Sequence, residues 1–231
     1  MADKLRYNGI MKSFEDNVIR FYAGDNPEMF EIERRCIDRN GKVLDFLKQH
    51  LPSGKILDVG AGNGFTAEKL MTNDRLIIPM EPDEKIIDQK KNLIWTRGVA
   101  QELPFHKDIF DGAYSTWAFF FPSMGIKRVK EGLTELNRVV KKDGTILIVD
   151  NAGDDEFMSL ADRVIVDFES DRKFWESMGF SSTMINTTFR FDNVEEAQKL
   201  LGFYFGEKGK NFNKTEIEYK VVVYEGKSKR K

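Results

Sequence analysis

Hydrophobic residues recur along this chain with two different periods, and the change of period divides it into stretches. The first fifty residues predict helices, because apolar residues fall on one helical face at multiples of about 3.6 residues. The residues of that face are Ile32, Cys36, Val43 and Leu47. Ser13 is the predicted N-cap, and residues 23–27, which contain a glycine and a proline, interrupt the helical pattern.

From residue 55 to residue 149, short apolar segments alternate with helical ones. This alternation predicts a parallel sheet with right-handed crossovers and with helices on both faces. Strands are predicted at 55–59, 76–80, 93–96, 113–116 and 145–149. Helices are predicted at 65–71, from near Asp83 onward, and at 127–140.

The hydrophobic period changes to two after Asp150. Residues 183–191 and 217–223 alternate strictly, and residues 194–205 between them form an amphipathic helical pattern. Half-buried strands of this kind suit the edge of a sheet and predict antiparallel pairing. We therefore predict an α/β fold: a Rossmann-like, doubly wound, mostly parallel seven-stranded sheet with helices on both faces and a late antiparallel edge strand.

Composition narrows the class of protein. The 231 residues include 36 basic and 38 acidic ones, so a formal net charge of −2 gives the whole molecule no attraction to a polyphosphate or an anionic membrane. We interpret the basic cluster at 227–231 as a solvated end. The single cysteine, Cys36, excludes an internal disulfide, and the first residues lack the apolar stretch of a signal peptide. We expect a soluble, cytoplasmic protein.

A glycine-rich loop follows the first strand of the predicted sheet. It reads Asp58-Val59-Gly60-Ala61-Gly62-Asn63-Gly64. In open parallel sheets, ligands bind beyond the carboxyl ends of the strands, where this loop lies. Alternate glycines let the backbone approach a ligand, and the helix that follows presents free N–H groups and the positive end of its dipole.

A dinucleotide site would have its third glycine at position 65, where this chain has Phe65. The bulk of Phe65 and the negative charge of Asp58 both disfavour a pyrophosphate. A ligand that carries a cationic sulfonium and an ammonium group tolerates the Asp58 carboxylate better. These residues therefore disfavour an NAD-dependent dehydrogenase, which remains a weaker enzymatic hypothesis than an enzyme that binds such a cationic ligand.

The glycine loop resembles the first motif of class I S-adenosylmethionine-dependent methyltransferases with a methyltransferase-11-like core. Four later segments resemble the same family pattern. Glu81 ends the second strand, 21 positions after Gly60. Residues 98–105 resemble the adenine-side loop, 110–118 the segment beside the methionyl group, and 135–144 the helix and turn into the fifth strand. The resemblance covers about residues 50–150 and implies S-adenosylmethionine as cofactor.

The resemblance also implies which residues bind the cofactor, with Glu81 on the ribose hydroxyls. Val99 stands where the family often has an aspartate, so the adenine contact falls to the backbone at Ala100 and to Gln101 or Glu102. We assign no metal site. The implied cofactor-binding residues are Asp58, Gly60, Ala61, Gly62, Asn63, Glu81, Pro82, Ala100, Gln101, Glu102, Thr116 and Trp117.

The sequence assigns no catalytic residue, because a base is needed only when the acceptor must lose a proton. The candidates for such a base are Asp150, Asn151, Tyr22 and His106. Of the aromatic cluster at Trp117 and 119–121, one or two rings are expected to line an acceptor pocket. The remaining aromatic residues are interpreted as packing: Trp175, Phe180 and the phenylalanines of 189–212.

We expect one domain, residues 1–231. In it, 1–50 form a helical N-terminal cap, 51–150 the cofactor-binding core, and 151–231 the strands and helices that complete the sheet and cap the acceptor. The expected partner is a small-molecule methyl acceptor, with no membrane. Two alternatives stay open: an RNA methyltransferase, which the near-neutral charge disfavours, and a catalytically silent S-adenosylmethionine-binding module.

Overall fold

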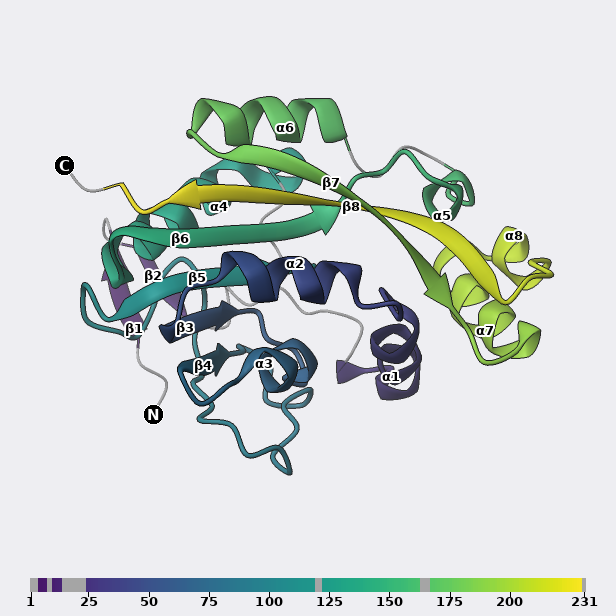
Figure 1. The fold of residues 1–231 in the computed structure, drawn as a ribbon, viewed down its shortest axis with the longest axis horizontal. Helices are drawn as coiled ribbons and strands as arrows, with labels where there is room; N and C mark the ends of the chain where they lie inside the picture. Colours follow the sequence, from purple (N-terminus) through teal and green to yellow (C-terminus); the bar gives the residue numbers. More distant parts are fainter. Residues whose placement is uncertain (1–3, 8–9, 14–23, 119–121, 163–166, 230–231) are drawn as a thin grey trace.

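The computed structural model describes residues 4–7, 10–13, 24–118, 122–162 and 167–229. Six strands form its main sheet, in the order β4-β3-β5-β6-β8-β7 (Figure 1). Strands β3 to β6 run parallel, whereas β8 is antiparallel to both β6 and β7. The bounds are β3 Gly54–Val59, β4 Arg75–Met80, β5 Phe110–Thr116, β6 Val140–Asn151, β7 Ser181–Arg190 and β8 Glu216–Lys227. The predicted Rossmann-like sheet with an antiparallel edge is confirmed.

Helices cover both faces of this sheet, as predicted. Four of them pack on one face: α1 Pro27–Cys36, α2 Lys42–His50, α3 Phe65–Leu70 and α7 Val194–Phe205. Two pack on the other: α4 Pro122–Val139 and α6 Phe168–Ser177. Two short helices, α5 Glu156–Ser159 and α8 Glu207–Lys210, lie at the same end of the molecule as α7 (Figure 1).

The two faces explain the continuous apolar runs in the central strands. Along β3, Ile56 belongs to the core under α2, whereas its neighbour Leu57 belongs to the core under α4. Along β6, Leu147 and Ile148 divide in the same way. Because successive side chains point to opposite faces, a strand that is covered on both sides must be apolar at every position.

The predictions for the start of the chain and for the segment after β4 were partly wrong. Residues 4–7 and 10–13 are not helical, because β1 Lys4–Tyr7 pairs antiparallel with β2 Ile10–Ser13. Ser13 lies in β2, and the residues after it, where the predicted helix would begin, lie outside the described residues. No helix begins at Asp83. Its carboxylate accepts the Lys85 N–H at 3.0 Å, a local turn that competes with helix formation.

The predicted strand at 93–96 is reduced to a single parallel bridge between Met80 and Thr96. The Thr96 N–H donates to the carbonyl of Pro79 at 2.9 Å. The next bond of such a ladder would need an N–H from Pro79, which proline lacks. The main sheet therefore has six strands in the described part of the chain, and not the seven expected. Within those residues, no helix combines the length and apolar character needed to cross a membrane.

Asp38 joins the N-terminal helices to the sheet. It lies in the turn between α1 and α2 with a φ of 48°, in the left-handed region. One carboxylate oxygen accepts the N–H groups of Val43 at 2.9 Å and Leu44 at 3.3 Å, in the first turn of α2. The other accepts the hydroxyl of Thr187 on β7 at 2.7 Å. A single carboxylate thus caps α2 and fixes it against the sheet.

Replacing this carboxylate should destabilise the fold. For Asp38→Ala we expect the free energy of unfolding to fall by about 1–3 kcal/mol, because capping and buried hydrogen bonds are lost together. Urea denaturation measures the change. Asp45→Ala is the matched control in the same helix, since Asp45 is 64% exposed and pairs only with Lys48 at 3.5 Å. Equal losses in the two variants would contradict the role of Asp38.

Candidate functional site

A cavity of about 640 Å³ lies beyond the carboxyl ends of β3, β4, β5 and β6. Its volume falls in the range of roughly 300–1,000 Å³ that is usual for small-molecule sites. Ten of the twelve residues predicted to bind a cofactor line it. They are Gly60, Ala61, Gly62, Asn63, Glu81, Pro82, Ala100, Gln101, Thr116 and Trp117. Asp58 and Glu102 do not line it.

The glycine loop forms one wall of the cavity with its backbone. Gly60, Gly62 and Gly64 have φ values of 75°, 57° and 75°, in the region that side chains disfavour. A Cβ on Gly60 would lie 2.7 Å from the Cβ of Ala118, and one on Gly62 would lie 3.0 Å from the Phe30 ring. The loop therefore needs glycine both for its conformation and for the close approach of its neighbours.

The carboxylate of Glu81 connects β4 to this loop. One oxygen accepts the Gly62 N–H at 2.9 Å, and the other accepts the Asp83 N–H at 3.0 Å. The residue is only 6% exposed, and burial raises the pKa of its carboxyl to about 7 against the effect of the two hydrogen bonds. Each oxygen keeps a second lone pair for a ligand, so Glu81 can accept from two hydroxyl groups.

Glu102 is placed differently from the other adenine-side residues. Its N–H donates to the Val99 carbonyl at 3.1 Å, and this tight turn leaves the Glu102 side chain exposed. Gln101 lines the cavity instead, and its Nε2 atom is buried without a hydrogen-bond partner among the described residues. Of the two side chains expected near the adenine, the geometry favours Gln101.

Thr116 ends β5, Trp117 follows it directly, and both line the cavity. Trp117 has a φ of 46°, an uncommon conformation for a large side chain that is often found at functional sites. Its N–H donates to the Val149 carbonyl of β6 at 3.0 Å, which holds the strained residue in place. Residues 119–121, the rest of the predicted aromatic cluster, lie outside the described residues.

Asp58 lies beneath the glycine loop and is completely buried. Its Oδ2 atom accepts the hydroxyl of Tyr114 at 2.8 Å, while Oδ1 has no partner in the described part of the chain. Burial, with a smaller contribution from the nearby charge of Glu81, raises the pKa of Asp58 to about 7 against the effect of the Tyr114 hydrogen bond. Asp58 supports the loop from below and is not in contact with the cavity.

The far half of the cavity is lined by residues that follow β6, which the sequence did not assign to a site. Phe189 and Phe205 pack in the core, as interpreted from the sequence, and they also line this half of the cavity. Phe189 faces the core and the cavity together because it lies on the inward side of the alternating strand β7. The other residues of this aromatic chamber are Phe157, Met158, Tyr204 and Tyr219.

Helix α1 lies across the same cavity and contributes Phe30, Glu33 and Arg34 to its lining. These residues were also missed, because the helical period marks only the buried face and does not show what the face covers. The Arg34 guanidinium carbon lies 5.5 Å from the ring centre of Phe30 and 5.2 Å from that of Trp117.

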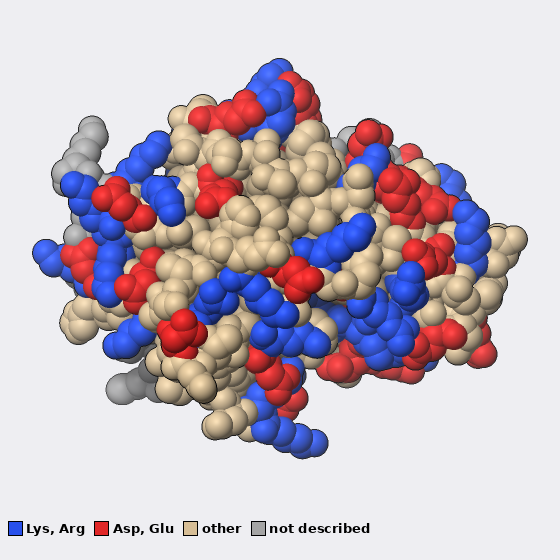
Figure 2. Space-filling view, viewed as in Figure 1, with Lys and Arg blue, Asp and Glu red and all other residues tan. Residues whose placement is uncertain are grey.

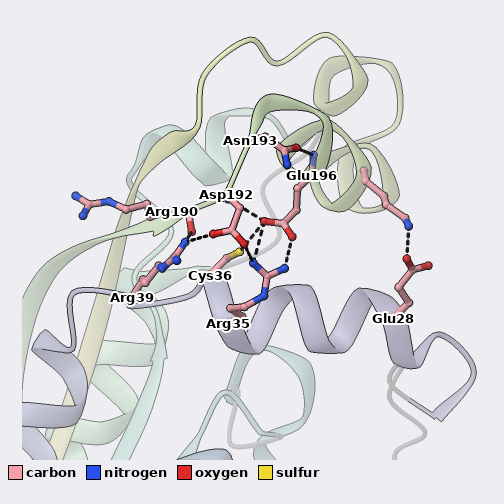
Figure 3. Close-up of polar contacts among 9 residues, drawn as sticks. Glu28, Arg35, Cys36, Arg39, Arg190, Asp192, Asn193 and Glu196 are labelled. Atoms are coloured by element: carbon pink, nitrogen blue, oxygen red, sulfur yellow. Dashed lines mark hydrogen bonds and ion pairs between the residues drawn. The ribbon is translucent and has the colours of Figure 1, made fainter.

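Ion pairs tie α1 to the elements that carry the aromatic chamber (Figure 3). Arg35 binds both Asp192 and Glu196, which lie before and within α7, and Arg39 binds Asp192 at 2.6 Å. At the other end of α1, Glu28 pairs with Lys199 of α7. These ion pairs, which we call the ionic clamp, join α1 to α7, and both helices contribute residues to the cavity lining.

The four candidate bases are distributed over different surroundings. Asn151 lines the cavity, and its side-chain oxygen accepts the hydroxyl of Tyr219. Asp150 is buried, which raises the pKa of its carboxyl well above the ordinary value, and it does not line the cavity. His106 is exposed on a loop away from the lining, and Tyr22 lies outside the described residues.

The lining fits the cofactor that the sequence implies. The glycine loop, where a Cβ would clash, fits the methionyl part of S-adenosylmethionine. The Glu81 carboxylate has free lone pairs for the ribose hydroxyls. The buried amide of Gln101, which has no partner among the described residues, fits the adenine. In place of a basic residue, the loop has Asp58 below it and Glu81 beside it, which suits a cationic ligand better than a phosphate.

The raised pKa of Asp58 makes a prediction about pH. Between its ordinary value of 3.8 and about 7, the unfolded chain ionises this carboxyl while the folded protein keeps it protonated. Stability therefore falls as pH rises through this window, and Asp58→Asn should remove the part of the fall that is due to Asp58. We expect the variant to gain stability relative to the wild type from pH 5 to pH 8, measured by urea denaturation.

Asp111 supplies the control for that experiment. Burial acts to raise the pKa of Asp111, but hydrogen bonds from the Lys141 ammonium and the Lys55 N–H outweigh it and lower the pKa. Asp111→Asn should therefore lose a similar amount of stability at pH 5 and at pH 8. If Asp58→Asn behaved in the same way as Asp111→Asn, Asp58 would be ionised in the folded protein and the prediction would fail.

Comparisons with known proteins agree with this geometry. The family model described as "Methyltransferase domain" matches residues 57–148. The biotin biosynthesis bifunctional protein BioHC of Cellvibrio japonicus is 30% identical over 115 residues, 46% of this chain and 22% of that protein. The uncharacterized protein MJ1252 of Methanocaldococcus jannaschii is 31% identical over 147 residues, 64% of this chain and 51% of that protein. The match thus spans about half or less of these relatives' length.

Solved structures show the same fold. A SAM-dependent methyltransferase from Thermotoga maritima, described as a possible histamine N-methyltransferase, superposes with a TM-score of 0.58 at 19% identity. The superposition covers 90% of this chain and 97% of that one. Sequence motif, family match and fold lead to one conclusion: residues 57–148 form a methyltransferase domain on the fold of S-adenosylmethionine-dependent methyltransferases, and this domain and fold imply S-adenosylmethionine as the cofactor.

Proposed function

We propose that this protein transfers the methyl group of S-adenosylmethionine to a small-molecule acceptor. One observation supports this most directly: a single cavity runs from the glycine loop and Glu81 to the aromatic chamber after β6. A cofactor held at the first end would present its methyl group toward the second. The cofactor supplies an activated methyl group as a sulfonium, and the rest of the reaction depends on how the chain positions the acceptor.

The residues divide between binding and positioning. Backbone groups at 60–63 and the Glu81 carboxylate would hold the methionyl and ribose parts, while Ala100 and Gln101 would hold the adenine. Thr116 and Trp117 lie where the two halves of the cavity meet. Holding an acceptor in line with a reacting methyl group can lower a barrier by about 7–11 kcal/mol, so no dedicated catalytic group is required for an acceptor that attacks without losing a proton.

We also propose that the chain is one domain in which the core 51–150 binds the cofactor and the flanking segments close the site. Helix α1 from the first fifty residues and α5 and α7 from 151–231 all contribute to the lining. The ionic clamp in Figure 3 would hold these two segments together over the bound ligands. Exclusion of water by such a cover strengthens the electrostatic interactions inside.

A small acceptor fits the site better than RNA. The cavity is enclosed by α1 on one side and by the aromatic chamber on the other, which leaves space for a compact molecule. Figure 2 shows acidic and basic side chains interspersed over the viewed face, without one extended basic surface of the kind that RNA binding requires. The Thermotoga relative described as a possible histamine N-methyltransferase also acts as support for a small acceptor.

Glu81 provides the test of cofactor binding. For Glu81→Ala we expect S-adenosylmethionine to bind 30–150-fold more weakly, roughly 2–3 kcal/mol, because charge-assisted hydrogen bonds to the ribose are lost. Isothermal titration calorimetry measures the dissociation constants. Glu84→Ala is the matched control, since Glu84 is 67% exposed and pairs with Arg97 outside the lining. Unchanged affinity in Glu81→Ala, or no binding by the wild type, would contradict the assignment.

Transfer itself is tested with methyl-labelled S-adenosylmethionine and a cell extract separated into small molecules, RNA and protein. We expect label to appear in the small-molecule fraction and to require the wild-type protein, with Glu81→Ala as the negative control. Label in the RNA fraction that declines steeply with salt would favour the RNA methyltransferase. Tight cofactor binding without transfer to any fraction would favour the catalytically silent module.

A further inference from the structure

Arg34 carries a buried guanidinium that makes few polar contacts with the described residues. The residue lies on α1, is 9% exposed and lines the cavity. Its Nε atom is buried and has no hydrogen-bond partner in the part of the chain that the structure describes. The nearest carboxylate, that of Glu33, is 3.5 Å from Nη2, well beyond the 2.7–2.9 Å that is usual for a charge-assisted N–H···O bond.

Other arginines of the described chain contrast with Arg34. Arg75 donates to three backbone carbonyls, and Arg138 donates to Glu135 and to two carbonyls. On α1 itself, Arg35 is bonded to Asp192 and Glu196 (Figure 3). A buried donor without a partner costs about 1–3 kcal/mol, and more when it is charged. A ligand that accepts hydrogen bonds from Arg34 in the cavity would offset this free-energy cost.

Two aromatic rings lie beside the Arg34 guanidinium. Its central carbon is 5.5 Å from the ring centre of Phe30 and 5.2 Å from that of Trp117, so the cation lies over both rings. The N–H groups of a guanidinium form a fork that matches the two oxygens of a carboxylate. The aromatic contacts hold the cation in the cavity wall without using these N–H groups in hydrogen bonds.

We propose that Arg34 binds a carboxylate group of a ligand in this cavity. This inference rests on the proposed function and deepens it, because it assigns a chemical group to the ligand at a stated side chain. Arg34 lies where α1 passes from the glycine loop, which Phe30 touches at Gly62, to Trp117. The carboxylate can therefore belong to the methionyl part of the cofactor or to the acceptor, and the experiment distinguishes the two.

The first arm compares two ligands that differ in the carboxylate-bearing group. S-adenosylhomocysteine carries the amino-acid group, and 5′-methylthioadenosine lacks it. If Arg34 binds the cofactor, Arg34→Gln should bind S-adenosylhomocysteine roughly 10–150-fold more weakly than the wild type does. Its affinity for 5′-methylthioadenosine should stay within twofold of the wild-type value. Arg34→Lys, which keeps the charge but not the fork, should give an intermediate loss.

The second arm tests the acceptor as the source. Protein saturated with S-adenosylhomocysteine is titrated with benzoate and phenylacetate, chosen because the neighbouring chamber is aromatic, and with benzyl alcohol as the uncharged comparison. If Arg34 binds an acceptor carboxylate, the wild type should bind the two acids and not the alcohol. The affinity of Arg34→Gln for the two acids should then be at least tenfold lower, while its affinity for S-adenosylhomocysteine is unchanged.

Arg39→Gln is the matched control in both arms. It removes the same charge five residues further on, but Arg39 lies outside the cavity lining and is bonded to Asp192 at 2.6 Å. If Arg34 had only a structural role, Arg34→Gln would have a lower melting temperature. It would also bind S-adenosylhomocysteine and 5′-methylthioadenosine more weakly, by the same factor for both. That result would overturn the proposal.

Two outcomes separate this inference from the proposed function. If the wild type binds S-adenosylhomocysteine but Arg34→Gln binds it equally well, and the acids bind to neither protein or to both equally, the Arg34 site is refuted and the proposed function stands. If the wild type binds no S-adenosylhomocysteine at all, the proposed function fails first, and the Arg34 proposal fails with it.

Discussion

The hydrogen bond between the Glu81 carboxylate and the Gly62 N–H is the interaction on which the site depends. It joins the end of β4 to the loop after β3, two strands that the sheet places side by side. The same carboxylate accepts the N–H of Asp83, so it fixes the loop after β4 as well. A group that holds two loops in one geometry before any ligand arrives reduces the ordering that binding would otherwise require.

Burial of this region has an electrostatic consequence. Asp58 and Glu81 lie close enough for the charge of one to affect the other, and burial raises the pKa of both carboxyls to about 7. Uncompensated carboxylates inside a protein are unfavourable, whereas a cationic ligand makes the ionised forms favourable again. The domain thus keeps in its core a pair of acids that suits a sulfonium, and it does so beneath a loop without side chains.

The outer part of the cavity is built from distant parts of the chain. Helix α1 comes from the first fifty residues, whereas α7 and the aromatic chamber come from the last eighty. The clamp of Arg35 with Asp192 and Glu196 connects them at the surface (Figure 3). Arg34 lies one residue away, with its guanidinium carbon 5.2 Å from the ring centre of Trp117. Two neighbouring arginines of α1 therefore have different contacts: Arg35 pairs with residues before and within α7, whereas Arg34 lines the cavity.

The alternation of strands and helices, the antiparallel late strands and ten residues of the cavity lining could be predicted from the sequence alone. This was possible because hydrophobic period and glycine spacing are local properties, and because the ends of parallel strands must meet at one edge. Only the tertiary structure decided that Glu102 is exposed, that Phe189 and Phe205 face the cavity, and that Arg34 lies across it. The positions of Phe189, Phe205 and Arg34 depend on contacts between segments far apart in the sequence, and the exposure of Glu102 depends on the turn that it forms with Val99. The hydrophobic period of a single sequence marks neither. Pro79 shows the same limit within one strand, since its missing N–H ended a ladder that the apolar pattern of 93–96 had predicted.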